Sequence, residues 1–565
     1  MPETEEDKRF YRDTESVAFR KIDDHQLAML DSLGKRRLAR RGEILYRAGQ
    51  RDIPFVAILS GAVEVFEARD GAEQILANGG PRDFIGDVAM LQGTSSLATS
   101  RVKSDEAEIL EIPAAKFRRA LAELPGLGEP IVSAFIMRRK RLQRDHEFAG
   151  FRVLSAHADR GGHQLHDFLD KNHIPHRLLE VETDIGAAVA KEFCLTTAEL
   201  PALITPAGEK RPHPSLREVA QLAGLLRPLR EGDEEEICTD LTIVGAGPAG
   251  LAAAVYAASE GLETVVLESY APGGQAGSSS LIENFFGFPT GISGGDLTYR
   301  AQLQAYRFGA KFSTPSQALR LEFGNGPHPI SLQVRDCPAR LHSKSLLIAT
   351  GADYRRLEAA GREQFENNGC YYAATALEGQ LCRGETVIVV GAGNSAGQAA
   401  MFLSEQAKRV LLVVRRGELA SSMSDYLSRR VTACNNIDIH YSTEIRQMSG
   451  GKMLESVELE NTATGERRTV ATPAIFSMIG ADPCTKWLPP EIERDEKGFI
   501  KTGAAVAGAP AWKDAQRPPG PLETSMPGVF AAGDVRAGSV KRCAAAVGEG
   551  GMAIAGVQHA MAATG

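Results

Sequence analysis

The chain has 565 residues, a formal net charge of −8, 43% hydrophobic and 24% charged residues. These values are ordinary for a globular protein and predict about three to four domains. The negative balance without a basic stripe argues against a nucleic-acid partner, and no apolar run is long enough for a membrane span. The eight cysteines form no C-x-x-C pair and show no zinc-ligand spacing, so we expect a cytoplasmic protein without a bound metal.

The first predicted domain covers residues 1–148. A helical lead-in is followed, between Gly42 and Ile112, by short alternating segments with glycine turns, such as Gly61–Phe66. Helical sequence resumes near Ala114. A small β-barrel followed by helices resembles a cyclic-nucleotide-binding domain of the catabolite-activator type.

That resemblance implies a ligand site at Gly86 and Asp87, where the family has a Gly-Glu pair that contacts the ribose. The family's phosphate-binding arginine is absent, because Ser96 or Leu97 occupies the aligned position. Arg101 lies too far along to be the same residue and is the candidate substitute. A charge-assisted contact to the phosphate is thereby lost. Two alternatives stay open: the barrel binds a cyclic nucleotide or another small ligand, or it is a structural or dimerising domain.

The second predicted domain covers residues 151–228. Its order of strands and helices resembles glutaredoxins and thioredoxins, with Pro201 at the family's cis-proline position. The family's redox C-x-x-C would come just after the first strand, where this chain has no cysteine. Dithiol exchange needs a low-pKa thiolate and a resolving thiol, so we expect a redox-silent docking module. We interpret its histidines as surface residues rather than metal ligands: His157, His163 and His166. Acidic residues 231–236 are the predicted linker to the C-terminal part of the chain.

The next stretch carries a dinucleotide-binding pattern. An apolar strand, Leu241–Val244, enters a G-x-G-x-x-G turn, and a helix and a second strand come next and end on Glu268. In such units the glycines permit a tight turn and close approach of the pyrophosphate, and the acidic residue about 20 positions on accepts from ribose hydroxyls. A carboxylate there suits an unphosphorylated ribose, as in FAD or NAD. The residues predicted for this turn are Gly245, Gly247, Pro248, Ala249 and Gly250.

The same pattern recurs from Thr386 to Arg416, with alanine in place of the third glycine. This unit ends in Arg415 and Arg416 rather than in a carboxylate. Guanidinium groups pair with a 2′-phosphate that a carboxylate would repel, so the second unit is predicted to bind NADPH. The residues predicted for this turn are Gly391, Gly393, Asn394, Ser395 and Ala396.

From residue 237 onward the chain resembles the low-molecular-weight thioredoxin reductase family. The resemblance rests on an ordered series of motifs: the first glycine turn, Gly273–Gln275, Glu283–Phe285, Ala349–Ala352, Ile479–Gly480 and Gly528–Val535. It implies hinges near Gly351 and Gly480. It also implies FAD contacts from Gly274, Gln275, Asn284, Gly533, Asp534, Cys543 and Ala544, with Asp534 on the ribityl chain and the helix after Arg542 directed at the flavin.

The chain departs from this family at the redox dithiol. Ala373 and Ala376 stand where the family has the two cysteines of its C-x-x-C. Alanine cannot carry electrons, so the route from FAD through a protein dithiol is interrupted. Cys370 and Cys543 are lone thiols. We interpret them as inert buried cysteines, with Cys370 as the alternative candidate for a catalytic thiol near the flavin, and the catalytic residue stays unidentified.

The sequence therefore predicts a multidomain fold: a β-barrel with helices, a small α/β thioredoxin-like domain, and two α/β Rossmann-like domains. The FAD domain is predicted over 237–353 and 479–565, and the NADPH domain over 354–478. We expect an FAD-containing oxidoreductase that passes a hydride from NADPH to FAD. The electron acceptor is unknown: a disulfide protein, ferredoxin or a small molecule.

Two alternatives stay open at this point. One is an enzyme that resembles ferredoxin–NADP reductases, some of which also lack the C-x-x-C. The other is a regulatory flavoprotein that senses redox state or a ligand without turnover. A homodimer is expected from the reductase family and from segment 136–147, which corresponds to the dimerisation helix of the barrel family.

Overall fold

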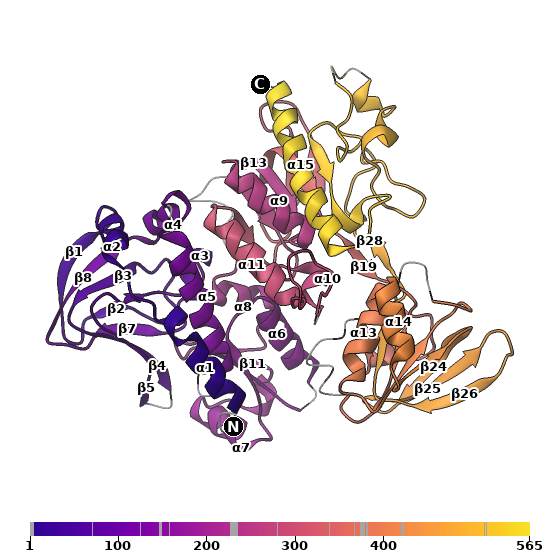
Figure 1. Cartoon of the computed structure of the whole chain (residues 1–565), viewed down its shortest axis with the longest axis horizontal. Coiled ribbons are helices and arrows are strands. Elements are labelled where there is room, and N and C mark those ends of the chain that lie inside the picture. The colour runs from indigo at the N-terminus through magenta and orange to yellow at the C-terminus, as the bar shows by residue number, and fades with distance from the viewer. Residues whose placement is uncertain are drawn as a thin grey trace. The chain divides into compact units, whose positions relative to one another are not determined.

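The computed structural model describes residues 5–564, except 70–71, 125, 146–147, 149, 158, 227–235, 280, 338–339, 367, 373, 375–378, 380–381, 420–422, 514 and 516. Figure 1 shows the chain, with many of the described elements labelled. The chain forms two compact units. One comprises Met1–Ala246, Leu251–Pro272 and Arg300–Leu346, and the other Gly247–Gly250, Gly273–Tyr299 and Leu347–Gly565. Of the predicted linker, only Glu236 lies within the described residues.

The first domain is the predicted barrel. Two antiparallel sheets have the strand orders β1-β8-β3-β6 and β2-β7-β4-β5. Gly61 makes the turn from β3 to β4 with a φ of +82°, and a Cβ there would lie 2.5 Å from the Glu106 carbonyl oxygen, so only glycine fits. The strands are β1 (Lys35–Arg40), β2 (Ile44–Tyr46), β3 (Phe55–Ser60), β4 (Val63–Arg69), β5 (Ala72–Gly79), β6 (Phe84–Ile85), β7 (Thr99–Val102) and β8 (Glu106–Ile112).

Five helices accompany the barrel: α1 (Glu5–Ala18), α2 (Asp24–Asp31), α3 (Val88–Gln92), α4 (Ala114–Glu123) and α5 (Gly128–Arg144). The basic side chains of α5 bind within the same domain. Arg141 donates to the Tyr11 carbonyl oxygen of α1 at 2.6 Å, and Arg138 donates to the Gly86 carbonyl oxygen at 2.9 Å. Helix α5 therefore fastens the helical lead-in to the barrel.

The second domain has the predicted thioredoxin-like order of elements. Its sheet has the order β10-β9-β11-β12, in which β9 runs parallel to β10 and antiparallel to β11. The Leu200–Pro201 peptide bond directly before β11 is cis, as predicted. Residues 151–226 are called the thioredoxin-like module below. Its elements are β9 (Phe151–Ser155), α6 (Arg160–Lys171), β10 (His176–Glu180), α7 (Asp184–Glu192), η1 (Thr197–Glu199), β11 (Ala202–Ile204), β12 (Lys210–Pro212) and α8 (Leu216–Ala223).

The first dinucleotide unit contains a mixed sheet of order β15-β14-β13-β18-β17-β16. Strands β13, β14 and β15 are parallel to one another, as the strand–helix–strand pattern predicts. The elements of this part are β13 (Glu236–Val244), α9 (Pro248–Ser259), β14 (Thr264–Leu267), α10 (Gly274–Gly277), α11 (Gly294–Arg307), β15 (Lys311–Ser313), β16 (Ala318–Phe323), β17 (Ile330–Val334) and β18 (Arg340–Ile348).

The second dinucleotide unit is built on a parallel sheet of order β20-β27-β21-β22-β23, beside a three-stranded antiparallel sheet, β24-β25-β26. Its elements are η2 (Arg362–Phe365), β20 (Cys370–Tyr371), β21 (Thr386–Val390), α13 (Asn394–Ser404), β22 (Arg409–Val413), α14 (Asp425–Ala433), β23 (Ile437–His440), β24 (Thr443–Gly450), β25 (Leu454–Asn461), β26 (Arg467–Ala471) and β27 (Ile475–Ser477).

Two short antiparallel strands, β19 (Ala352–Tyr354) and β28 (Ala481–Pro483), lead into and out of this sheet. The chain ends in η3 (Gly503–Val506), η4 (Pro510–Trp512), β29 (Val529–Ala531), η5 (Gly533–Val535) and α15 (Cys543–Thr564). Among the helices of the described residues, none has the length and apolar character that a bilayer crossing requires.

Candidate dinucleotide-binding sites

Glu268 lies at the carboxyl end of β14 and is 9% exposed. Its Oε2 accepts from the Ala246 amide at 2.8 Å, and its Oε1 accepts from the Tyr270 amide at 3.0 Å. Burial raises the pKa of this carboxyl, although the amide donors oppose the shift. Oε1 also accepts from the Ser269 hydroxyl at 3.2 Å. Each carboxylate oxygen has two lone pairs, so Oε2 keeps the capacity to accept from a ligand hydroxyl group.

The backbone of Gly247, in the first turn, lies close to the backbone of a second glycine turn that contains Gly273 and Gly274. A Cβ on Gly274 would lie 3.0 Å from the Gly247 Cα, and both Gly273 and Gly274 have positive φ. A Cβ on Gly533 would lie 3.0 Å from the Ala249 Cβ in the first turn of α9. The structure thus brings Gly247, Ala249, Gly274 and Gly533 together around the start of α9, where a pyrophosphate binds in such units.

Asp534 comes directly after Gly533 and is half-buried. Within the described part of the chain, no hydrogen bond reaches its carboxylate oxygens, although the Lys541 ammonium donates to its backbone carbonyl oxygen at 2.5 Å. Burial raises the pKa of Asp534. The carboxylate therefore has no hydrogen-bond donor among the described residues, and the hydroxyl groups of a polyhydroxyl ligand would supply such donors. Ala544 lies exposed in the first turn of α15.

Gln275 and Asn284 are also predicted to lie beside the flavin, and their surroundings differ from those of the residues described above. The Gln275 side-chain amide donates to the Ala352 carbonyl oxygen in β19, so it ties the second glycine turn to the connecting strand. Asn284 is exposed. Its neighbour Glu283 forms a two-oxygen ion pair with Arg430 of α14 at 2.7 and 2.8 Å.

The second turn lies between β21 and α13. Gly391 has a φ of +144°, and a Cβ there would lie 2.4 Å from the Met478 carbonyl oxygen. Gly393 is the N-cap of α13. Asn394 accepts from the Ser424 amide at 2.7 Å, which fixes the start of α14, while Ser395 is exposed and Ala396 is buried.

Arg415 and Arg416 lie just after β22 and are exposed. Several other arginines of this domain are paired, as Arg409 is with Asp438 and Arg430 with Glu283. For Arg415 and Arg416, no ion pair is present among the described residues. Two adjacent guanidinium groups without a carboxylate partner are an arrangement that attracts a phosphate group.

The two lone thiols named in the sequence analysis, Cys370 and Cys543, lie in unreactive settings. Cys370 is fully buried, and burial raises its pKa to about 11. Burial, with the nearby Asp534 charge, also raises the pKa of Cys543 to about 11. Both are therefore protonated thiols at neutral pH, unlike catalytic cysteines, whose pKa is lowered. Ala373 and Ala376 lie outside the described residues.

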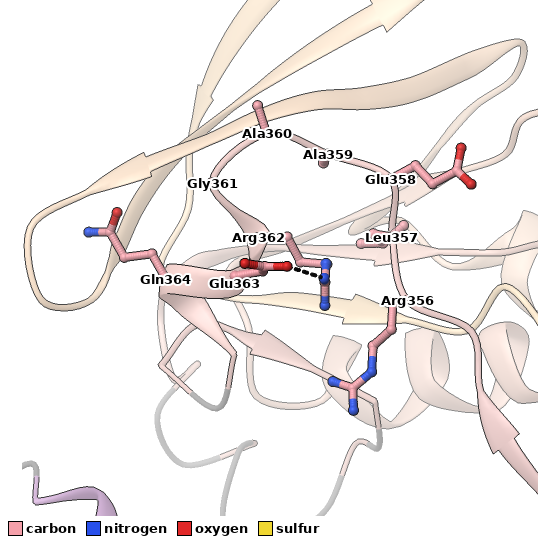
Figure 2. Close-up of a pocket in the computed structure, with 9 residues that line it drawn as sticks. All are labelled: Arg356, Leu357, Glu358, Ala359, Ala360, Gly361, Arg362, Glu363 and Gln364. Carbon is pink, nitrogen blue, oxygen red and sulfur yellow. Dashed lines mark hydrogen bonds and ion pairs between the residues drawn. The ribbon is translucent and has the colours of Figure 1, made fainter.

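The segment that comes after β19 forms a pocket of about 630 Å³ (Figure 2). It is lined by residues 356–364. Figure 2 shows the Arg362 guanidinium directed at Glu363, which it approaches to 3.4 Å. None of the residues predicted to bind FAD or NADPH lines this pocket.

In the barrel, Asp87 is already engaged. Its Oδ1 accepts from the Ala89 amide at 2.8 Å as the N-cap of α3, and its Oδ2 pairs with Arg139 of α5 at 2.7 Å. The Arg139 side chain is 1% exposed. Arg101 pairs with Glu64 at 2.7 Å and is not a free phosphate ligand. A ligand at Gly86 and Asp87 would therefore compete with Arg139.

Two of the three histidines predicted as surface residues, His157 and His166, have side-chain partners, and His163 is exposed. His157 lies 3.1 Å from Glu180, and the His166 Nδ1 lies 2.6 Å from the His176 Nε2. Within the described ranges, no group of three His, Cys, Asp or Glu side chains is arranged to hold a metal ion.

Two residues that sequence reasoning missed bear on these sites. Arg139 neutralises Asp87 from 52 residues away, and Tyr270 donates to Glu268 while its ring contacts the thioredoxin-like module. Tyr270 stands two residues after the predicted carboxylate, a position that could have been flagged. Nothing in the sequence signals Arg139 as the partner of Asp87.

Comparison with known proteins agrees with this arrangement. Residues 239–550 match the family described as pyridine nucleotide-disulphide oxidoreductase, and residues 36–123 match the cyclic nucleotide-binding domain. Thioredoxin reductase of Treponema pallidum is 32% identical over 314 residues, which cover 56% of this chain and 94% of that protein. NADPH-dependent thioredoxin reductase 3 of Arabidopsis thaliana is 33% identical over 323 residues, 56% of this chain and 57% of that protein, so the chain spans just over half of that relative.

The crystal structure of Lactococcus lactis thioredoxin reductase is also similar, with a TM-score of 0.51 and 28% identity over 57% of this chain and 99% of that one. The family match includes both glycine turns, and the predicted fold class is confirmed. The chain therefore belongs to the pyridine nucleotide-disulphide oxidoreductase family, as a thioredoxin reductase-like flavoenzyme with a cyclic nucleotide-binding domain in its N-terminal part.

Proposed function

We propose that this chain oxidises NADPH with FAD bound at the first turn, and that its electrons leave without passing through a protein dithiol. One observation carries the cofactor assignment. The first unit ends in Glu268, a buried carboxylate held by amides, and the second ends in two exposed guanidinium groups that have no ion pair among the described residues. A 2′-phosphate would be repelled by the Glu268 carboxylate and attracted by the guanidinium groups of Arg415 and Arg416.

The residues at the first turn fit FAD. Glu268 would accept from the hydroxyls of the adenosine ribose, and the close backbones of Gly247 and Gly274 leave room for the pyrophosphate at the start of α9. The Asp534 carboxylate would accept from ribityl hydroxyls, which supply the donors that it lacks in the described part of the protein. Bound FAD would supply hydride acceptance from NADPH and onward electron transfer.

NADPH would bind across α13 and β22. The Ser395 hydroxyl and the first amides of α13 would contact its pyrophosphate, and Arg415 and Arg416 its 2′-phosphate. We propose that β19 and β28 form the hinge that moves this domain relative to the FAD site. Gly351 and Gly480 flank these strands with φ of +66° and +104°, and a Cβ on either would meet no atom within 4 Å. The wide backbone range of glycine suits such positions to a hinge.

The acceptor would take electrons at the flavin itself. The sequence has no C-x-x-C, and Cys370 and Cys543 are protonated at neutral pH, so neither can start a thiol–disulfide exchange. This favours a quinone, a one-electron carrier such as ferredoxin, or oxygen over a disulfide protein. The barrel would bind a small ligand without a phosphate-binding arginine in its 86–97 segment. The protein would act as a cytoplasmic homodimer.

The test is NADPH oxidation by the purified, FAD-loaded chain with a panel of acceptors. We expect turnover with ferricyanide and with a water-soluble quinone, and none with the disulfide reagent DTNB, with or without thioredoxin. Restoring the dithiol by Ala373→Cys with Ala376→Cys should create DTNB reduction while quinone reduction persists. DTNB reduction by the wild-type chain at a rate comparable to quinone reduction would overturn the proposal.

A further inference from the structure

Tyr270 connects the carboxylate of the first dinucleotide unit to the thioredoxin-like module. On one side its amide donates to the Glu268 Oε1 at 3.0 Å. On the other side its hydroxyl donates to the Asp167 Oδ2 of α6 at 2.7 Å. Its ring packs edge-on against Phe168 at 5.5 Å between centroids, and its carbonyl oxygen accepts from the Asn172 side chain at 3.3 Å.

These contacts all come from α6 and its C-cap, so they hold the backbone of Tyr270 at a fixed place. Phe168 is fully buried in the core of the module, and Asp167 is also bound by Lys171 at 2.9 Å. An anchored backbone keeps the Tyr270 amide aimed at Glu268. Because Glu268 is buried, loss of an amide donor would leave its charge under-compensated, and the carboxylate would turn away from the position in which it meets a ribose.

The module also contacts a loop of the barrel. This rim loop, residues 93–98, joins α3 to β7 and includes the segment that carries the phosphate-binding arginine in related barrels. Ser95 donates through its hydroxyl to the Leu222 carbonyl oxygen at 3.0 Å and through its amide to the Ala223 carbonyl oxygen at 3.2 Å, at the end of α8. Leu97 is 4% exposed and lies in the same hydrophobic cluster as Phe168.

We propose that the redox-silent thioredoxin-like module is a coupling element, in which Tyr270 positions Glu268 for FAD and the rim loop of the barrel sets how firmly Tyr270 is held. The inference rests on the proposed function, since it needs FAD at Glu268. In this proposal the thioredoxin-like module has a role that does not require a cysteine. It also gives the barrel a physical route to the flavin site through one shared hydrophobic core.

The first arm of the test measures the FAD dissociation constant of the full chain after flavin removal and reconstitution. Tyr270→Phe should weaken FAD about fivefold to tenfold, with an unchanged KM for NADPH. This is less than the full effect of a lost hydrogen bond to a charged group, because the bond to Asp167 acts on FAD only through the position of Glu268. Asp167→Ala should match it, whereas Asp167→Asn, which keeps an acceptor for the hydroxyl, should stay within about twofold of wild type. Tyr256→Phe is the matched control, because Tyr256 is 52% exposed on α9.

The second arm tests the route from the barrel with a double-mutant cycle. Leu97→Ala, or Leu97→Val if the alanine variant is insoluble, should weaken FAD in the wild-type background and have little further effect with Tyr270→Ala. Leu110→Ala on β8 is the control, because Leu110 is buried in the barrel but lies outside the shared cluster. It should leave FAD affinity unchanged.

The outcomes separate the two claims. A wild-type chain that takes up no FAD would refute the proposed function. FAD uptake with equal affinity in wild type, Tyr270→Phe and Asp167→Ala would refute the positioning role of Tyr270. An equal effect of Leu97→Ala in both backgrounds, or an effect of Leu110→Ala as large as that of Leu97→Ala, would refute coupling through the module.

Discussion

Replacing Arg415 and Arg416 together by alanine should remove the preference for NADPH over NADH. Both guanidinium groups are exposed and have no ion pair among the described residues, so a bound 2′-phosphate would gain their charge-assisted hydrogen bonds without breaking one. At an exposed site we assign each contact about 1.5 kcal/mol, the low end of the range for charged hydrogen bonds. Two contacts give about 3 kcal/mol, or roughly a hundredfold in the ratio of kcat/KM values.

The assay is steady-state oxidation of each nucleotide with ferricyanide as acceptor. The double variant should lose about a hundredfold in kcat/KM for NADPH and change little with NADH. The control is Arg409→Ala at the other end of β22, where the guanidinium already pairs with Asp438, and it should keep the preference. The reasoning is refuted if the wild-type chain uses both nucleotides equally, or if the double variant still prefers NADPH.

Three further predictions concern a glycine, a thiol and a histidine. Gly274→Ala should abolish FAD retention, because the Cβ would lie 3.0 Å from the Gly247 Cα, whereas Gly384→Ala, equally left-handed but in open space, should retain FAD. Cys370→Ser should leave quinone reduction within about twofold, because burial keeps this thiol protonated; a large loss would show a redox role. Burial lowers the pKa of His176 to about 4. Because an unfolded His titrates near 6.5, the unfolded chain binds the extra proton between these values, and up to about 3 kcal/mol of stability should be lost as pH falls from about 6.5 to 4. His176→Asn should flatten that slope in thermal unfolding, and an unchanged slope would contradict it.

Local patterns made much of the fold predictable. The strand–turn–helix order around Glu268 and before Arg415 can be inferred from glycine positions and apolar runs, and the structure places β13, α9 and β14, then β21, α13 and β22, at the predicted positions. The cis bond at Pro201 also agrees with the prediction from the order of elements. These features depend on residues close together in the chain.

The features that the sequence did not reveal join distant segments. Asp87 and Arg139 are 52 residues apart, and Tyr270 and Asp167 are 103 residues apart. No periodicity or motif links such pairs, since each depends on how elements that are far apart in the chain pack. The interpretation of the thioredoxin-like module as a docking unit rested on its missing cysteines. Its contacts with Tyr270 and with the rim loop became visible only in the structure.

The central claim is that the hydride half-reaction is intact although the family's dithiol is gone. Its most direct test is anaerobic rapid mixing of the FAD-loaded chain with NADPH, and with NADH in parallel, while the flavin absorbance near 450 nm is recorded. We predict rapid bleaching by NADPH and slow or no bleaching by NADH. Bound flavin that neither nucleotide bleaches would contradict the account and would favour a regulatory flavoprotein without turnover.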